Sequence, residues 1–342
     1  MRNLLSLLFS VSLFAGCAGV EPQKYADGGD PNIATQVFYG TDRNLQDASK
    51  PSRFYGLKRG TVSYGVASVS VVKSNRKTTL EEVNPTSPEE FLQQLQAAVE
   101  SAKSAKILVF VHGYNRSFHQ VSKQIAEFCL TTGFDGVPVI WSWPSSRNPA
   151  GYLEDETNMR WSQPHLARFL RVVIDQSGAE TVHLVGHSMG ARGMTDVLLR
   201  DLLPGGINKE KIGEYVLLAP DIDAGIFRRD LAPQLVASGL HTTLYTSAND
   251  KALASAYALR RYPRAGDSSY GPVVVSGIET IDATQANKSI LGHSYFEESD
   301  EVSDDLAELL NSRKPAERRP GLEYVGGEGA GYWVLQAPGS KP

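Results

Sequence analysis

Short, almost uninterrupted apolar runs alternate along the chain with longer segments whose apolar residues recur every three or four positions. The clearest runs are at 107–111, 137–141, 182–185 and 215–218, and a further strand is predicted at Thr242–Tyr245. Continuous apolar runs are typical of parallel strands buried on both faces, whereas the segments between them have the spacing of amphipathic helices. We therefore expect an α/β fold, with a mostly parallel sheet and helices on both faces.

Weaker patterns complete this alternation. Two segments before the first apolar run, Gln36–Tyr39 and Gly60–Val72, alternate apolar and polar residues, which predicts antiparallel edge strands. A last strand is predicted near Glu279–Ile281. Helices are predicted between the strands, with Ser87 as the cap of the first, at 88–103, 117–131, 156–176, 191–199, 227–237 and 300–310.

Both ends of the chain differ in composition from this alternating middle. Residues 17–34 are polar and contain Gly and Pro, which predicts a flexible tether. From Asn311 the composition shifts to Arg, Pro and Gly, so residues 312–342 are predicted to be a tail, in which Tyr332–Leu335 could dock on the body. One folded domain is expected at 35–311.

The first residues resemble a targeting signal. Leu4–Phe14 is apolar and too short to span a bilayer, and Leu13-Phe14-Ala15-Gly16-Cys17 is similar to a bacterial lipoprotein cleavage box, with Phe14 where leucine is usual. This predicts a signal peptide at 1–16 and a lipidated Cys17 that holds the protein to a membrane. Ala18 in place of Asp after this cysteine is compatible with the periplasmic side of an outer membrane. The alternative is an ordinary secretory signal with an incidental cysteine.

Composition narrows the classes of function. Lys and Arg total 34 and Asp and Glu total 38, so the charge is nearly balanced. No basic stripe with interleaved aromatic residues is visible, which argues against nucleic acid as a partner. No zinc-ligand spacing or phosphate-binding loop is visible either, so we expect no metal or organic cofactor.

The stretch Thr181–Met194, TVHLVGHSMGARGM, joins an apolar run to a helical pattern through a tight turn. The sequence G-x-S-x-G between a strand and a helix is typical of a nucleophile elbow. Its glycines let strand and helix approach closely, and Ser188 is expected in a strained conformation at a helix N-terminus. Free N–H groups there favour a developing negative charge, so Ser188 is the predicted nucleophile.

A nucleophilic serine needs a histidine base and an acid that orients it. In the fold that carries this elbow, the acid and then the histidine follow the serine along the chain. Only His241 and His293 of the seven histidines come after Ser188. His241 stands at the start of a predicted strand, at the wrong end of the sheet, so His293 is the predicted base.

Three aspartates are candidates for the acid. Asp250 follows the strand predicted at 242–245, whereas Asp221 and Asp223 follow the run at 215–218. We predict Asp250 as the acid and keep Asp221 and Asp223 as the alternative. Helix capping and loop hydrogen bonds are the other explanation for Asp221 and Asp223.

Two backbone N–H groups are needed to stabilise the oxyanion of an acyl-transfer reaction. Met189, directly after the nucleophile, and Tyr114, in the loop after the run at 107–111, are predicted to supply them. His112 is predicted to hold the loops around the elbow in place rather than to act in catalysis.

These motifs together resemble an uncharacterised bacterial family of α/β-hydrolases, known as a domain of unknown function. The resemblance covers about 37–310 and is carried by HGYN at 112–115, WPS at 143–145, GHSMG at 186–190, LAPD at 218–221, SANDKAL at 247–253 and GHSY at 292–295. It implies an α/β-hydrolase fold with Ser188, Asp250 and His293 as the triad. It does not imply a substrate, because a fold does not determine function.

These observations predict a serine hydrolase that forms an acyl-enzyme. No long insertion that would form a large lid is visible, which favours a carboxylesterase acting on short or polar acyl esters, small or lipid-like. A peptidase or amidase acting on cell-envelope material and a catalytically silent, membrane-tethered scaffold are the alternatives.

Two groups of residues are candidates for substrate contacts. Trp141, Trp143 and Tyr152 could line an acyl pocket, although packing is the favoured interpretation of the tryptophans. Arg260, Arg261 and Arg264 could attract an anionic group, although a solvated basic loop is favoured for them.

Overall fold

The computed structural model describes residues 32–72, 75–148, 150–286, 293–327 and 330–337. The predicted signal peptide, Cys17 and most of the predicted tether lie outside these residues. In the described part of the chain, no helix is both long and apolar enough to cross a membrane.

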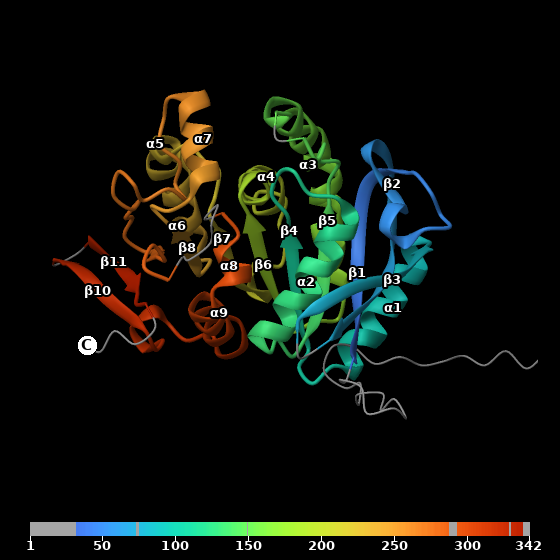
Figure 1. Ribbon diagram of the computed structural model, residues 1–342. Coiled ribbons are helices and arrows are strands. Elements are labelled where there is room, and N and C mark those ends of the chain that lie inside the picture. The colour runs from blue at the N-terminus through green and yellow to red at the C-terminus, as the bar shows by residue number, and fades with distance from the viewer. Residues whose placement is uncertain (1–31, 73–74, 149, 287–292, 328–329, 338–342) are drawn as a thin grey trace, which may run out of the picture.

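One mixed sheet runs through the molecule (Figure 1). Its strand order is β10-β11-β9-β8-β7-β6-β4-β5-β1-β2-β3. The eight strands that lie between β11 and β1 in this order, these two included, are parallel to their neighbours within the group. The strands are β1 Asn32–Leu45, β2 Tyr55–Val72, β3 Lys77–Thr86, β4 Lys106–Val111, β5 Val137–Ser142, β6 Thr181–His187, β7 Ile212–Leu218, β8 Thr242–Thr246, β9 Glu279–Asp282, β10 Leu322–Gly327 and β11 Ala330–Leu335.

Helices cover both faces of this sheet. They are α1 Pro88–Ser101, α2 Phe118–Thr132, α3 Tyr152–Gln176, α4 Met189–Val197, α5 Ala224–Ile226, α6 Ala232–Ser238, α7 Lys251–Arg260, α8 Tyr295–Glu298 and α9 Asp300–Ser312. Figure 1 shows α2 and α9 on the same side of the strands. The expectation of an α/β fold with a mostly parallel sheet and helices on both faces is confirmed.

The core consists of two apolar layers, one on each face of the sheet. Successive residues of β4 belong to alternate layers, because side chains along a strand point to opposite faces. Val109 packs in the layer that contains Phe169 of α3, and Phe110 packs in the layer that contains Leu306 of α9. Each fully buried side chain of this kind contributes about 1.5–3 kcal/mol.

The edges of the sheet differ from the prediction. Gln36–Tyr39 belongs to β1, which lies between β5 and β2 and is therefore an interior strand. The edge on that side is β3, which the sequence pattern did not predict. In β3, buried Leu80 and Val83 are separated by Glu81 and Glu82. Ser68 and Val69 of β2 pair with Glu82 and Leu80, so Glu81 is an extra residue in β3 and the regular alternation is lost.

The predicted C-terminal tail contains two strands. β10 and β11 form an antiparallel hairpin, and Trp333 of β11 pairs with Ile281 of β9. Docking of Tyr332–Leu335 on the body is therefore confirmed, whereas the expectation that the strand at Glu279–Ile281 is the last one is wrong. Pairing with β9 stabilises a segment whose own composition does not predict a strand.

Helix termini follow the local sequence. Ser87 caps α1 as predicted, and its side chain accepts a hydrogen bond from the N–H of Glu90. Ser117 caps α2 in the same way through Gln120. Both pairs are capping boxes, which set the residue at which each helix begins. For α2, this residue directly follows the loop that leaves β4.

Candidate active site

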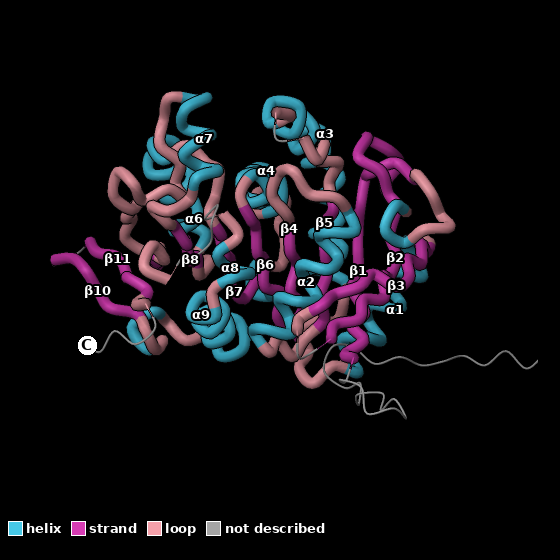
Figure 2. Tube along the Cα trace, viewed as in Figure 1, coloured by secondary structure: helices cyan, strands magenta, loops and turns pink. Residues whose placement is uncertain are grey.

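Ser188 lies between β6 and α4, at the carboxyl edge of the parallel strands, where loops and helix ends meet (Figure 2). Its backbone has φ 54° and ψ −122°, a strained conformation for a residue with a side chain. The strain is held from β7 and its loop: the Ser188 N–H donates to Leu218 O at 3.0 Å, and the Asp221 N–H donates to Ser188 O at 3.2 Å.

Glycines make this turn possible because three backbone segments meet there. A Cβ at Gly186 would stand 2.6 Å from Ala191 Cα, and one at Gly190 would stand 2.3 Å from His112 O. A Cβ at Gly113 would stand 2.9 Å from Ser188 Cβ. The loop after β4 therefore lies directly against the nucleophile elbow, as the sequence predicts for that motif.

His293 and Asp250 meet beside this turn. Asp250 is 1% exposed at the start of α7, and its Oδ1 accepts a hydrogen bond from the N–H of Leu253 at 2.9 Å. His293 Nδ1 lies 2.7 Å from Asp250 Oδ2. His293 Nε2 is buried and has no hydrogen-bond partner among the described residues.

The charges around His293 set its proton affinity. Burial alone would lower the pKa of the imidazole. The negative charge of Asp250, its hydrogen bond to Nδ1 and the more distant Asp221 outweigh burial and raise the pKa of His293 above its ordinary value. The arrangement thus stabilises the imidazolium form that would arise when Nε2 accepts a proton.

His187 supports His293 from the elbow side. The two rings are 4.6 Å apart, and His187 Nε2 lies 3.1 Å from the backbone O of His293. Burial holds the pKa of His187 well below its ordinary value, so its imidazole is neutral and Nε2 carries the proton that it donates. No role for His187 is predicted from the sequence, although its position next to Ser188 places it in contact with the site.

Asp221 and Asp223 have other partners. Tyr152 Oη donates to Asp221 Oδ2 at 2.6 Å, and Arg264 Nε lies 3.3 Å from Asp221 Oδ1. Asp223 caps α5, where its Oδ1 accepts from the N–H of Ile226 at 2.9 Å. The described structure therefore pairs His293 with Asp250 and engages the two alternative aspartates elsewhere.

Tyr114 and Met189 both present backbone N–H groups near the elbow. Met189 is the first residue of α4, and the N–H groups of a first helical turn have no partner within the helix. The N–H groups of Asn115 and Arg116 donate to Asp155 Oδ2 and Ser145 Oγ, both at 3.2 Å. The N–H of Tyr114, which lies between Gly113 and these two residues in the chain, donates to no acceptor among the described residues.

His112 is buried within the loops, as predicted. Its ring stacks on Trp143 with centroids 5.0 Å apart, and Trp143 Nε1 donates to His112 O at 2.8 Å. His112 Nδ1 lies 2.7 Å from Gly113 O. Burial lowers the pKa of His112 well below its ordinary value, so the ring is neutral and holds the loop rather than exchanging protons.

Most of the residues considered as substrate contacts pack against other parts of the protein. Trp141 and Trp143 are fully buried, which confirms the packing interpretation. The expectation of a solvated basic loop is wrong for two arginines: Arg260 ends α7 and pairs with Glu156, and Arg264 is buried against Asp221. Tyr152 lies beside Tyr114, with ring centroids 5.9 Å apart, close to the elbow.

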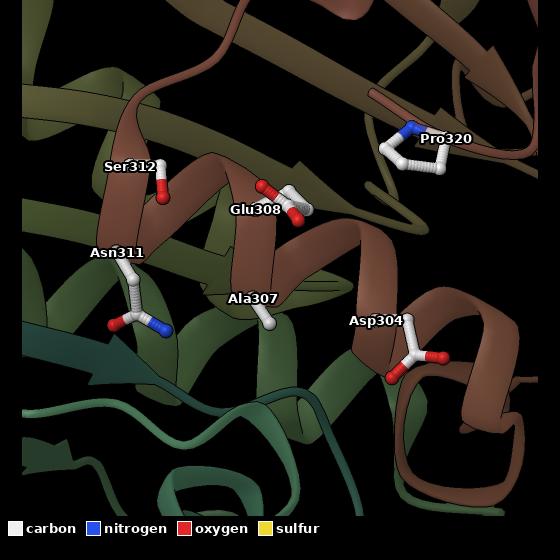
Figure 3. Close-up of a pocket in the computed structure, with 6 residues that line it drawn as sticks. All are labelled: Asp304, Ala307, Glu308, Asn311, Ser312 and Pro320. Carbon is white, nitrogen blue, oxygen red and sulfur yellow. The ribbon is translucent and has the colours of Figure 1, made fainter. Parts of the chain in front are cut away.

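A hollow of about 410 Å³ elsewhere on the surface lies along α9 (Figure 3). It is lined by Asp304, Ala307, Glu308, Asn311, Ser312 and Pro320. Lys106, at the amino end of β4, donates from Nζ to Asn311 O at 2.9 Å. The hollow is therefore at the opposite edge of the sheet from Ser188 and is separate from the site described above.

Among the residues that the structure describes, no group of three or more His, Cys, Asp or Glu side chains could hold a metal ion. Cys129 is buried in α2 and forms no disulfide with another described residue.

The fold and the elbow define the class of protein, and comparison with known families agrees. A sequence model described as "alpha/beta hydrolase of unknown function" matches residues 87–313, more than half of the chain. The chain belongs to this family of α/β-hydrolases. Comparison with curated proteins gives no match.

Solved structures with a similar fold include several hydrolases. A predicted CIB-like hydrolase from Thermoplasma acidophilum is 15% identical, with 72% of this chain and 94% of that chain covered and a TM-score of 0.36. Carboxylesterase CesB from Bacillus subtilis is 13% identical, with 73% and 89% covered and a TM-score of 0.34. Esterase Est22 is 11% identical, with 81% and 80% covered and a TM-score of 0.36. At these values, the similarities say nothing about the substrate of this chain.

Proposed function

We propose that this hydrolase is a carboxylesterase whose nucleophile is Ser188, with His293 as base and Asp250 as acid. The observation that carries the proposal is the placement of His293. Its Nδ1 is bonded to buried Asp250, and its Nε2 is buried without a partner in the described structure. An imidazole held on one side and unpaired on the other is the arrangement that a general base beside a serine requires.

In the proposed reaction, Ser188 Oγ attacks the ester carbonyl carbon while His293 Nε2 accepts the hydroxyl proton. Asp250 Oδ2 accepts the hydrogen bond from Nδ1 and so holds the imidazole in the productive tautomer. The N–H groups of Tyr114 and Met189 donate to the oxyanion of the tetrahedral intermediate. Collapse of this intermediate expels the alcohol, which takes the proton from Nε2 and leaves an acyl-Ser188 ester.

Water then completes the cycle. His293 Nε2 accepts a proton from the water as its oxygen attacks the acyl-Ser188 carbonyl. The second tetrahedral intermediate collapses, the proton returns from Nε2 to Ser188 Oγ, and the carboxylic acid leaves. The reaction consumes one ester and one water and needs no further reactant.

The surroundings of Ser188 support short or polar acyl groups. Ser188 is 2% exposed, and the aromatic rings of Tyr114 and Tyr152 lie close to the elbow. Trp141 and Trp143, which could have lined a deep acyl pocket, are fully buried in the core instead. A long acyl chain would therefore require a rearrangement that a short one does not.

Hydrolysis of p-nitrophenyl esters with two, four, eight and twelve acyl carbons tests this proposal, alongside p-nitroanilides of matched acyl groups. The expected result is turnover that falls with chain length and is much slower on the anilides. Ser188→Ala and His293→Ala should abolish it, whereas Ser312→Ala, an exposed serine on α9, should not. Turnover that survives Ser188→Ala would contradict the assignment, and faster cleavage of anilides would favour an amidase.

We also propose that Cys17 carries a lipid that tethers the domain to a membrane of the bacterial cell envelope. The proposal is supported by the similarity of residues 13–17 to a lipoprotein cleavage box. Cys17→Ser should move the protein from the membrane fraction to the soluble fraction. Continued membrane association of that variant would contradict lipidation at this residue.

A further inference from the structure

Arg43 is a buried cation at the carboxyl edge of the sheet, close to the loops of the candidate site. It lies in β1 and is 1% exposed. Its guanidinium holds groups from several segments. The acceptors are Ser142 Oγ at 2.9 Å, Gly56 O at 3.2 Å, Ser145 O at 3.3 Å, Arg116 O at 2.7 Å and His112 Nε2 at 3.4 Å.

Two of these acceptors bracket Tyr114. His112 and Arg116 stand two residues before and two residues after it, and one nitrogen of Arg43, Nη2, contacts both. From another side, the carboxylate of Asp155 accepts the N–H of Asn115. The segment 112–116, which we call the oxyanion loop, is thus held at both ends and beside its centre. The Tyr114 N–H is left without a recorded acceptor among the described residues.

The charge of Arg43 is costly to bury and is not neutralised by direct contact. Burial lowers the pKa of Arg43 to about 9, although the charges of Asp42 and Asp155 oppose this effect, so the group stays protonated at neutral pH. Asp42 itself is bonded to His165, with Oδ2 and Nδ1 3.0 Å apart. A buried charge that is held mainly by carbonyl and hydroxyl oxygens contributes little to the stability of a fold. The presence of Arg43 is better explained if it fixes the positions of the loops that it contacts.

We propose that Arg43 is a positioning residue that fixes the oxyanion loop, so that the Tyr114 N–H is directed at the acyl oxygen of a substrate on Ser188. This inference rests on the proposed esterase function and extends its machinery to β1. Arg43 precedes residue 87, where the match to the family begins. The N-terminal strand β1 would then contribute a residue that positions the active site, in addition to extending the sheet.

Arg43→Lys tests this role, because lysine keeps the positive charge and loses the planar fork that reaches several acceptors at once. Arg319→Lys is the matched control. Arg319 is equally buried, and it contacts Tyr245, Asp305 and Glu279, away from the oxyanion loop. Both variants are made in the full chain, and their thermal midpoints are measured together with their kinetics.

The kinetic readout compares p-nitrophenyl acetate with its thionoester analogue, in which sulfur replaces the carbonyl oxygen. Sulfur accepts hydrogen bonds poorly, so well-aligned N–H donors favour the oxygen ester. For Arg43→Lys we expect kcat on the oxygen ester to fall about 10²-fold with little change in KM, since small displacements of catalytic groups have effects of this size. The ratio of ester to thionoester rates should fall with it, and Arg319→Lys should keep the wild-type ratio.

An unchanged ester-to-thionoester ratio in Arg43→Lys, or an equal fall in Arg319→Lys, would overturn the inference. If Arg43→Lys does not fold, Ser142→Ala serves instead, because it removes one acceptor and leaves Arg43 in place. That variant should lower the ratio less strongly in the same direction, and an unchanged ratio would again overturn the inference. Turnover retained in Ser188→Ala would instead contradict the proposed function, so the two failures are distinguishable.

Discussion

At the scale of single residues, the partners of three aspartates distinguish their roles. Asp250 Oδ2 accepts from His293, whereas Asp221 is bonded to Tyr152 and Asp223 caps a helix. All three follow predicted strands, and the sequence favoured Asp250 while keeping Asp221 and Asp223 as alternatives. His293 contacts Asp250, and no local sequence pattern encodes that contact.

Replacement of the acid should therefore have unequal effects. Asp250→Asn should lower kcat by about 10³–10⁴-fold, because the amide no longer holds the histidine in the tautomer that accepts a proton at Nε2. Asp221→Asn should lower it by less than about tenfold, since its partners are Tyr152 and Arg264. Steady-state kinetics with p-nitrophenyl acetate measure both effects. The reverse order would assign the acid to the loop after β7.

The dependence of activity on pH follows from the surroundings of His293. The base must be neutral, so kcat/KM falls as the pH drops through the pKa of His293, which Asp250 raises above the ordinary 6.5. In Asp250→Asn, the negative charge that opposes the effect of burial is lost, so the pKa of His293 should fall. The acid limb of the pH profile should then move to lower pH. A pH profile of each protein measures this shift. An acid limb at the same pH in both would show that another group controls it.

At the scale of elements, α2 connects helix formation to the geometry of the oxyanion loop. Its first turn is fixed by the capping box of Ser117 and Gln120, directly after Arg116. The capping box of α1, between Ser87 and Glu90, is chemically similar. Nothing in the described structure connects Ser87 to the elbow, so the two caps form a matched pair.

Ser117→Ala and Ser87→Ala should each lower the free energy of unfolding by about 1 kcal/mol, the usual effect of losing a cap. Only Ser117→Ala should also lower kcat, because fraying of α2 releases the loop that carries Tyr114. Denaturant unfolding and kinetics on the same samples measure both quantities. Equal kcat in the two variants would mean that the cap of α2 does not influence the loop.

Elements were predictable from the sequence where a local pattern and a buried environment agree. β4, β5, β6, β7 and β8 are buried along nearly their whole length and were predicted within two residues at each end, except that β7 begins three residues earlier than predicted. α7 was missed because its alanine-rich sequence has no clear polar face, and β11 was uncertain because pairing with β9 stabilises it. Arg43 was missed because its partners at 56, 112, 116, 142 and 145 come together only in the folded chain.

At the scale of the whole molecule, ionic contacts attach the C-terminal segment to the amino edge of the sheet. His241 contacts both Glu214 and Glu279, and Arg319 donates to Glu279 at 2.8 Å. Arg313 Nε donates to Glu214 at 3.2 Å. These contacts lie at the edge away from Ser188, so they concern stability. They also agree with the prediction that His241 is at the wrong end of the sheet to act as the base.

Stability should therefore depend on the charge of His241. Hydrogen bonds to Glu214 and Glu279 raise its pKa to about 9 from 6.5. A pKa raised by folding contributes stability that is fully present below about pH 6.5 and is lost as the pH rises through about 9. His241→Gln should reduce the fall in melting temperature over this range, and His119→Gln, on α2, should not. Equal curves for wild type and His241→Gln would contradict this role.

The central claim is that Ser188 is an activated nucleophile, and labelling with a fluorophosphonate probe tests it most directly. The probe bonds covalently to a serine oxygen that has an adjacent base, and peptide mass spectrometry locates the adduct. We predict an adduct on Ser188 in the wild-type protein that is lost in Ser188→Ala and His293→Ala and retained in Ser312→Ala. A folded wild-type protein that is not labelled, or an adduct on another serine, would contradict the account.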